Sequence, residues 1–381
     1  MASELVGAGM QDSGQRGGGR TAPEAAVGET ATKAAFGRRG RRPNAAGHPV
    51  TVRAERLLRN ADFVAYWLVV APLAARLPAR LAYRVACWRG DWSFRYRAGK
   101  RAETVRNLRQ VLCDELGPDE AERMARDFFR MMACVAIDVM RLRGRARSLR
   151  KLVEIRGREH LDAALAGGRG AILCSPHLGS YDSAFCLLHA IGYPVTTIGR
   201  NAVGLKWGPS SAEQRFWNLV YTRRLLRHRQ RPNIEPWPGR VQVAVQAEAV
   251  LRANEVVTIC SDAPPLDADR ARAIEVTFLG RRARLLPGVV TLARLTGAPV
   301  LMISVHRLAD YRHQVLEISP PVPMGGETAT AFGRCVAAMD AAIRTRPADW
   351  VYWADTDHLV TFGLLPAAPS AGTEQIYVHS A

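Results

Sequence analysis

The chain lacks the short motifs that mark several large enzyme classes. It has no Gly-x-Ser-x-Gly, no P-loop, no Gly-x-Gly-x-x-Gly after an expected strand and no spacing typical of a zinc site. These absences argue against a hydrolase with its own serine nucleophile, a P-loop nucleotidase, a dinucleotide-dependent enzyme and a zinc protein.

Lysine is scarce, and arginine carries nearly all of the positive charge. Only Lys33, Lys100, Lys151 and Lys206 stand among 53 basic residues, and 35 acidic residues leave a formal net charge of +18. Such an excess favours anionic partners, and guanidinium groups bind phosphate through two parallel hydrogen bonds. Codon usage in a GC-rich genome explains part of the excess equally well. No recognition motif accompanies the arginines, so no nucleic-acid partner is expected.

Paired cysteines and a long apolar run are also missing. The seven cysteines show no Cys-x-x-Cys spacing, which indicates a reducing compartment and buried thiols. The apolar run over 63–75 is broken by Pro72 and falls short of the roughly 20 residues that a membrane span needs. Within residues 53–97, aromatic residues are interleaved with arginines, which suits a helix lying in the bilayer interface. A helical hairpin packed on the core explains the same pattern as well.

Composition divides the chain into four parts. Residues 1–50 are rich in glycine, alanine and arginine without an apolar period, and they predict a disordered basic tail that lacks the apolar core of a signal peptide. Residues 51–150 predict a helical lead-in that associates with a membrane. Residues 151–362 predict an α/β domain, and 363–381 a C-terminal tail.

Short apolar strands alternate with helices from residue 153 onward. Strands are expected at 153–157, 171–174, 194–198, 256–260, 276–280, 300–305 and 314–318, and helices at 159–165, 182–191, 241–251 and 287–296. This alternation predicts an α/β fold in which helices cover a sheet.

The stretch 170–182 holds the candidate catalytic residues. Pro176 ends an apolar strand, and His177 follows at its carboxyl end, where open α/β sheets bind ligands. Asp182 can accept a hydrogen bond from one imidazole nitrogen, which leaves the other nitrogen as a general base. In this arrangement the substrate supplies the nucleophile. We expect Cys174, inside the strand, to be a core residue.

Two more strand ends carry polar residues, Arg200 and Asp262, and strand ends on one sheet edge converge. We therefore expect both near His177. Arg200 is a candidate for binding phosphate or stabilising an oxyanion.

His177-Leu-Gly-Ser-Tyr-Asp182 resembles the HxxxxD/E box of the lysophospholipid acyltransferase superfamily, in the branch of the lipid A lauroyl/myristoyl acyltransferases and the phosphatidylinositol mannoside acyltransferases. The resemblance runs from about Asn107 to about Trp353, through an Asn-Leu-x-x-Val lead-in, the blocks at 278–280 and 287–300, and a closing Pro-x-x-Trp element at 347–353. Asp182 stands where the lipid A enzymes usually carry glutamate. The segment 201–239 departs from the family pattern, as does the ending after Trp353.

The resemblance implies a mixed β-sheet flanked by helices, similar to glycerol-3-phosphate acyltransferase, with His177 and Asp182 as the catalytic pair. It implies no metal and no resident cofactor. It implies a fatty acyl thioester donor, acyl-CoA or acyl carrier protein, as co-substrate, and a glycolipid or phospholipid hydroxyl as acceptor. It also implies a peripheral or monotopic protein on the cytoplasmic face of the cell membrane. Arg284 and Asp262 match positions of the mannoside branch and, with Arg200, are candidates for substrate binding.

Two other functions stay open at this point. The same pair could activate water in a thioesterase, or the protein could bind lipid without catalysis.

Overall fold

A computed structural model describes residues 64–112, 116–142, 146–199, 233–234, 240–263, 265 and 267–366. All of them belong to one compact unit, Arg53–Ala381. The tail predicted at 1–50 and most of the tail predicted at 363–381 lie outside the described residues, so the four-part division stays a prediction.

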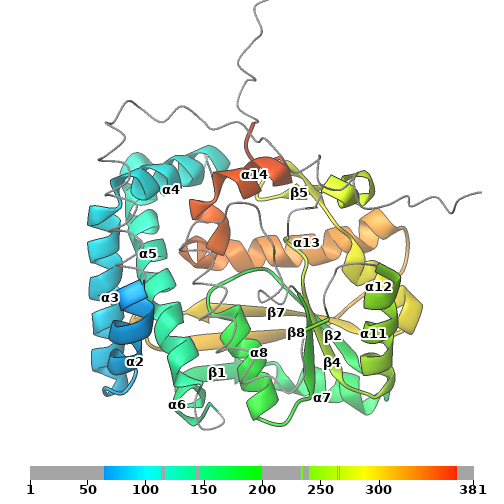
Figure 1. The fold of residues 1–381 in the computed structure, drawn as a ribbon. Helices are drawn as coiled ribbons and strands as arrows, with labels where there is room; N and C mark the ends of the chain where they lie inside the picture. The colour runs from blue at the N-terminus through cyan, green and yellow to red at the C-terminus, as the bar shows by residue number, and fades with distance from the viewer. Residues whose placement is uncertain are drawn as a thin grey trace, which may run out of the picture. The chain divides into compact units, whose positions relative to one another are not determined.

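The lead-in is helical where it is described. A π-helical turn (η1, Tyr66–Val70) continues through α2 (Ala71–Ala74), and α3 (Ala79–Tyr96), α4 (Ala98–Val111), α5 (Pro118–Arg141) and α6 (Arg147–Arg150) follow. Helix α5 begins with Pro118 in its first turn, where proline loses no hydrogen bond, and two acidic residues there favour the helix dipole. Figure 1 shows α3 and α5 side by side. None of the described helices is long and apolar enough to span a bilayer.

A six-stranded mixed sheet forms the centre of the unit. Its strands are β1 (Val153–Arg156), β2 (Ala171–Ser175), β3 (Val195–Ile198), β4 (Val256–Cys260), β7 (Val300–Arg307) and β8 (Gln314–Val322), in the order β1-β8-β7-β2-β4-β3. The four strands β3, β4, β2 and β7 are parallel, whereas β8 runs antiparallel to β7. The predicted mixed sheet flanked by helices is confirmed.

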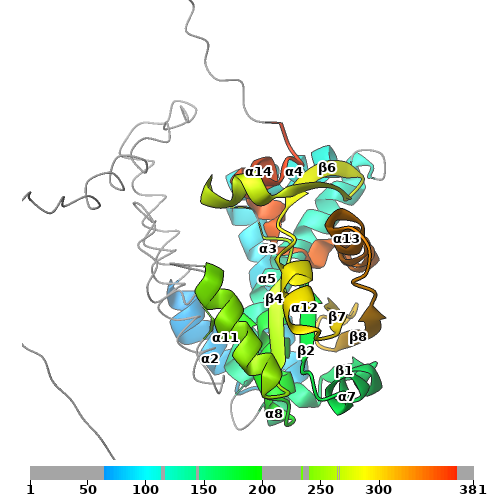
Figure 2. The ribbon, with the colours of Figure 1, turned by 90° about the vertical axis from the view of Figure 1, so that its right-hand side faces the viewer.

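Side chains of β2 alternate between two cores, as the pleat of a strand requires. Ala171 and Leu173 face a core that includes α7 (Arg158–Ala166) and α8 (Tyr181–Ala190). Ile172 and Cys174 face the larger core, to which α11 (Arg240–Arg252), α12 (Gly288–Thr296) and α13 (Thr328–Thr345) contribute. Figure 2 shows α12 beside β2 and β4. Helices thus bury both faces of the sheet, which explains why β2 is apolar throughout.

The strand predicted at 276–280 lies outside this sheet. It is β5 (Ile274–Phe278), which pairs with β6 (Arg281–Leu285) in a separate antiparallel hairpin after the 3-10 helix η4 (Asp267–Arg272). Leu279 and Gly280 make the tight turn, both with positive φ. The prediction missed β6 because three of its five residues are arginines, which hide its alternation of buried and exposed positions.

The C-terminal segment packs against the stretch after β2 that contains His177. It consists of η5 (Pro347–Asp349), η6 (Val351–Ala354) and α14 (Thr356–Phe362). The backbone N–H of Val351 donates to the carbonyl of His177 at 3.1 Å, and Gly179 N–H donates to the carbonyl of Asp349 at 2.7 Å. This backbone pairing fixes the predicted Pro-x-x-Trp element against the box at 177–182.

Candidate active site

The site lies at the carboxyl ends of the parallel strands. His177 follows β2 by two residues, and Asp262 follows β4 by two residues. Because β2 and β4 are parallel neighbours, the two residues converge, as the sequence predicted. Arg200, predicted to follow β3 into the same place, lies outside the described residues, and its role stays a prediction.

The Asp262 carboxylate holds the histidine through two contacts. Oδ1 lies 2.6 Å from His177 Nδ1, and Oδ2 accepts the backbone N–H of His177 at 2.8 Å. The indole N–H of Trp350 donates to the same Oδ2 at 2.8 Å. A carboxylate that accepts the Nδ1 proton selects the tautomer in which Nε2 carries the free lone pair. The histidine is therefore arranged to take a proton at Nε2.

The carboxylate at His177 Nδ1 belongs to Asp262, whereas the sequence suggested Asp182 as the orienting partner. Asp262 is fully buried and its carboxylate accepts hydrogen bonds from His177 and Trp350. The predicted catalytic role of Asp182 and the predicted substrate-binding role of Asp262 stay predictions. Asp182 is half-buried in the first turn of α8, and its charge acts on the imidazole from there.

Opposing effects set the pKa of His177. Burial lowers it, because a desolvated imidazolium is disfavoured, but the charge and hydrogen bond of Asp262 outweigh burial, and Asp182 adds to them. The pKa is therefore raised above the usual 6.5. The imidazole side chain keeps 18% of its surface exposed, so a substrate can reach it.

Aromatic residues surround the imidazole. The Tyr352 hydroxyl lies 3.3 Å from Nδ1, and the rings of Tyr181 and Tyr352 stand edge-on at 5.0 and 5.1 Å. The buried Trp350 ring packs on Phe278 of β5 and on Trp353. The hairpin and the C-terminal segment thus form the wall behind the histidine.

The predicted substrate-binding residue Arg284 lies on β6. Its guanidinium donates to the backbone carbonyls of Arg270 at 3.1 Å and Ala273 at 3.3 Å. These contacts fix the hairpin to η4 and do not involve the His177 pair. A substrate contact by Arg284 stays a prediction.

The hydroxyls and thiol next to His177 already have partners. Ser175 Oγ donates to the carbonyl of Pro176 at 2.7 Å, and Ser180 Oγ donates to buried Asp138. Cys174 is fully buried, and its hydrogen bond with Cys335 together with burial raises its pKa well above the usual range. Cys174 is thus a core thiol, as predicted, and none of the six described cysteines forms a disulfide. That the substrate supplies the nucleophile stays a prediction.

Sequence reasoning missed three residues around the site. Trp350 and Tyr352 were noted only as part of a family element, although three aromatic residues within 350–353 signalled a packed wall. Arg307 ends β7, the fourth parallel strand, so the rule that found His177 and Asp262 would have found it too.

The chain matches known acyltransferases. The profile of the family described as Bacterial lipid A biosynthesis acyltransferase matches residues 53–354. A phosphatidylinositol mannoside acyltransferase of Mycobacterium tuberculosis is 32% identical over 201 residues, which are 51% of this chain and 57% of that protein. A lipid A biosynthesis acyltransferase of Haemophilus influenzae is 23% identical over 291 residues, 75% of this chain and 83% of that protein. The chain thus spans less than two thirds of the mycobacterial relative.

Proposed function

The chain belongs to the bacterial lipid A biosynthesis acyltransferase family, and from this premise we propose that it is an O-acyltransferase that moves a fatty acyl chain from a thioester to a lipid hydroxyl. The hydrogen bond between His177 and buried Asp262, at the carboxyl ends of two parallel strands, is the observation that carries the proposal. The donor is acyl-CoA or acyl carrier protein, and the acceptor is a glycolipid or phospholipid. The relatives named above act, by their names, on lipid A or on phosphatidylinositol mannoside.

The proposed reaction uses His177 twice. Nε2 takes the proton of the acceptor hydroxyl as its oxygen attacks the thioester carbonyl, and Asp262 stabilises the imidazolium that results. The new C–O bond forms, the C–S bond breaks, and the departing thiolate takes the proton from Nε2. Asp182 adds negative charge near the imidazolium. The net positive charge of the chain favours a phosphorylated donor.

The reaction class is tested with radiolabelled palmitoyl-CoA and a crude membrane lipid extract. Loss of a general base costs about 10²–10⁴-fold in rate, so His177→Ala should lose transfer by that factor. His313→Ala is the matched control, because His313 also pairs with an aspartate, at 2.7 Å, but outside the site.

A labelled lipid made by the wild type and the control, but not by His177→Ala, supports transfer. Label released as free fatty acid with or without acceptor would establish a thioesterase instead. Repeating the assay with acyl carrier protein distinguishes the two donors. Undiminished transfer by His177→Ala would refute the proposed base.

We propose that the protein associates with the membrane through η1, α2 and α3. The exposed side chains of this stretch include large apolar residues together with arginines: Leu68, Val69, Leu73, Leu77, Leu81, Trp88, Trp92, Tyr96, and Arg76, Arg80, Arg84 and Arg95. Trp88 is 66% exposed, whereas Tyr66 and Trp67 are buried in the core. Exposed aromatic and basic residues in one stretch are typical of proteins that dock in the bilayer interface. Tyr66 and Trp67 thus fit the explanation by core packing, and the exposed residues of the stretch 53–97 are the ones proposed to contact the membrane.

Co-sedimentation with vesicles of phosphatidylcholine and phosphatidylglycerol tests this surface. The double variant Leu81→Ser with Trp88→Ser should bind at least about tenfold more weakly, because each side chain contributes about 1.5–3 kcal/mol when buried. Leu295→Ser with Leu308→Ser, two exposed leucines elsewhere, is the matched control. Equal binding by both double variants would place the membrane contact on another surface.

A further inference from the structure

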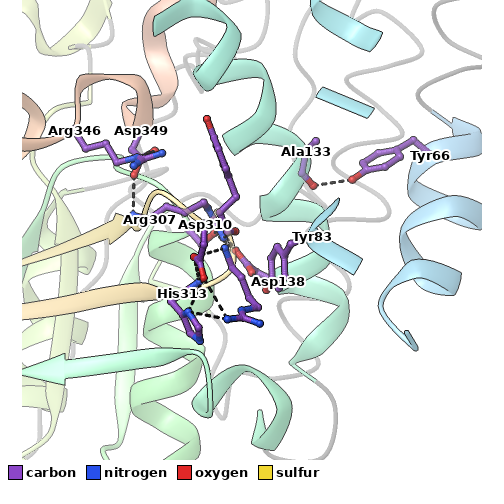
Figure 3. A network of polar contacts seen from close by, with 12 residues as sticks. Tyr66, Tyr83, Ala133, Asp138, Arg307, Asp310, His313, Arg346 and Asp349 are labelled. Atoms are coloured by element: carbon purple, nitrogen blue, oxygen red, sulfur yellow. Dashed lines mark hydrogen bonds and ion pairs between the residues drawn. The ribbon is translucent and has the colours of Figure 1, made fainter. Parts of the chain in front are cut away.

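A buried cluster of charged and polar side chains lies behind the box at 177–182. Asp138 of α5 and Arg307 of β7 form an ion pair in which both side chains are almost wholly buried. Tyr83 of α3 donates to Asp138 Oδ1, and Ser180 donates to Oδ2. Figure 3 shows Tyr83, Asp138 and Arg307 together, with Asp349 on the far side of Arg307.

Ser180 connects this cluster to the box. It is the residue before α8, a position where serine usually caps the helix by accepting an N–H of the first turn. Here its side chain makes no such cap. It donates to Asp138 instead, and it accepts Arg307 Nη2 at 2.9 Å. The hydroxyl therefore makes a tertiary contact and leaves its own helix without a side-chain cap.

Backbone contacts also hold the box, in addition to the Asp262 side chain that binds His177. The His177 carbonyl and the Gly179 N–H pair with Val351 and Asp349. Gly179 has φ +56, and a Cβ there would lie 2.9 Å from the Val305 carbonyl, so only glycine fits. Between His177 and α8, the Ser180 side chain thus adds a contact from the turn to the buried pair Asp138–Arg307.

Stability alone does not explain the ion pair. Burying two charges removes their hydration, and well-packed apolar residues are often as stable or more so. Arg307 is also bound at three other sites: its backbone N–H donates to Asp349 at 2.9 Å, Nη1 donates to the Tyr311 carbonyl at 2.9 Å, and its guanidinium lies over Tyr83. A guanidinium held in this way has a fixed orientation, and so does the hydrogen bond that it donates to Ser180.

We infer that Ser180 is a positioning residue: the buried pair Asp138–Arg307 fixes its hydroxyl, and Ser180 in turn sets the turn that presents His177 to Asp262 and to substrate. The inference rests on the proposed function for its kinetic consequence but not for its geometric one. Ser180 contacts no reacting atom in this scheme and acts through His177.

Two matched variants test the inference. Ser180→Ala and Tyr83→Phe each remove one buried hydroxyl that donates to Asp138, but only Ser180 belongs to the box. Both leave the ion pair intact, so both should fold, with a similar fall in Tm. Ser180→Ala should lower kcat about 10- to 100-fold with KM for the donor within about twofold, because a misplaced base affects the transition state. Tyr83→Phe should keep kcat within about twofold.

A second readout is independent of acyl transfer. NMR titration of selectively labelled histidines, with His177 assigned by its loss in His177→Ala, reports the imidazole surrounded by Asp262, Asp182, Tyr181 and Tyr352. In Ser180→Ala the His177 pKa should fall as contact with Asp262 loosens, and in Tyr83→Phe it should not move.

If Ser180→Ala matches Tyr83→Phe in both kcat and the titration of His177, the inference is overturned. If the protein catalyses another reaction of the same histidine, the titration shift persists, so failure of the proposed function is distinguishable from failure of the inference.

Discussion

Two histidine–aspartate pairs in this protein have almost the same length and different surroundings. His177 Nδ1 and Asp262 Oδ1 are 2.6 Å apart, and His313 Nδ1 and Asp310 Oδ2 are 2.7 Å apart. Asp262 has no exposed side-chain surface, whereas Asp310 is 42% exposed. The first pair joins residues that follow two different strands, β2 and β4, whereas the second lies within one turn between β7 and β8. Figure 3 shows Asp310 and His313 of the second pair. The burial of the aspartate and the elements that supply the two residues therefore distinguish the pair in the site from the pair in the turn. The distance between the nitrogen and oxygen atoms does not.

The two aspartates also differ in their other ligands. Asp310 accepts the backbone N–H groups of Arg312 and His313, which fix the turn; burial works to raise its pKa, and these contacts hold it below the usual range. Asp262 accepts the N–H of His177 and the indole of Trp350, both parts of the site. A carboxylate in the turn stabilises the backbone, and the one in the site orients an imidazole.

The largest effect that separates the pairs is expected from Asp262→Asn. The amide removes the charge that stabilises the imidazolium and favours the wrong tautomer, so kcat should fall about 10²–10⁴-fold, by analogy with the same change in a serine protease triad. Asp310→Asn should stay within about twofold. Steady-state acyl transfer by the two purified variants is the measurement. Comparable rates for both would show that the buried carboxylate does not serve the reaction.

The pH dependence of the wild type gives the next largest effect. The base must be neutral, and the pKa of His177 is raised, so activity should be lost as pH falls through a midpoint above 6.5, about tenfold per unit below it. Asp262→Asn removes the main cause of the raised pKa and leaves burial, which lowers it, so the residual activity of this variant should have its midpoint at lower pH. Profiles of kcat/KM between pH 5 and 9 give both midpoints. A midpoint that does not move, or moves upward, contradicts this assignment of charges.

Trp350→Phe should give the smallest effect, about three- to tenfold in kcat, because it removes one donor to Asp262 and leaves an aromatic ring in place. A hydrogen bond to a charged group contributes about 1.5–3 kcal/mol to stability. Trp353→Phe is a close control, because Trp353 is also fully buried and its indole donates at 2.6 Å to the carbonyl of Pro347. Both variants should unfold at lower denaturant concentration, and only Trp350→Phe should slow transfer. An equal loss of rate in both would reduce Trp350 to a packing residue.

Much of the fold followed from local patterns. The strands at 171–174, 256–260 and 300–305 were predicted because burial on both faces of a sheet requires a short, continuous run of apolar residues. The hairpin of β5 and β6 was not, because pairing outside the main sheet depends on contacts with the C-terminal segment. Strand β6 consists mainly of arginines and so has no apolar run by which it could be predicted.

The sequence by itself determined the family, most strands of the main sheet and the place of His177 at a strand end, because each of these depends on short stretches of neighbouring residues. Only the tertiary structure decided which carboxylate meets the imidazole. Asp182 is five residues away and Asp262 is 85, and the parallel register of β2 and β4 brings the distant one to Nδ1. Trp350 and the pair Asp138–Arg307 reach the same place from still more distant segments. Long-range packing sets such contacts, and no local pattern encodes them.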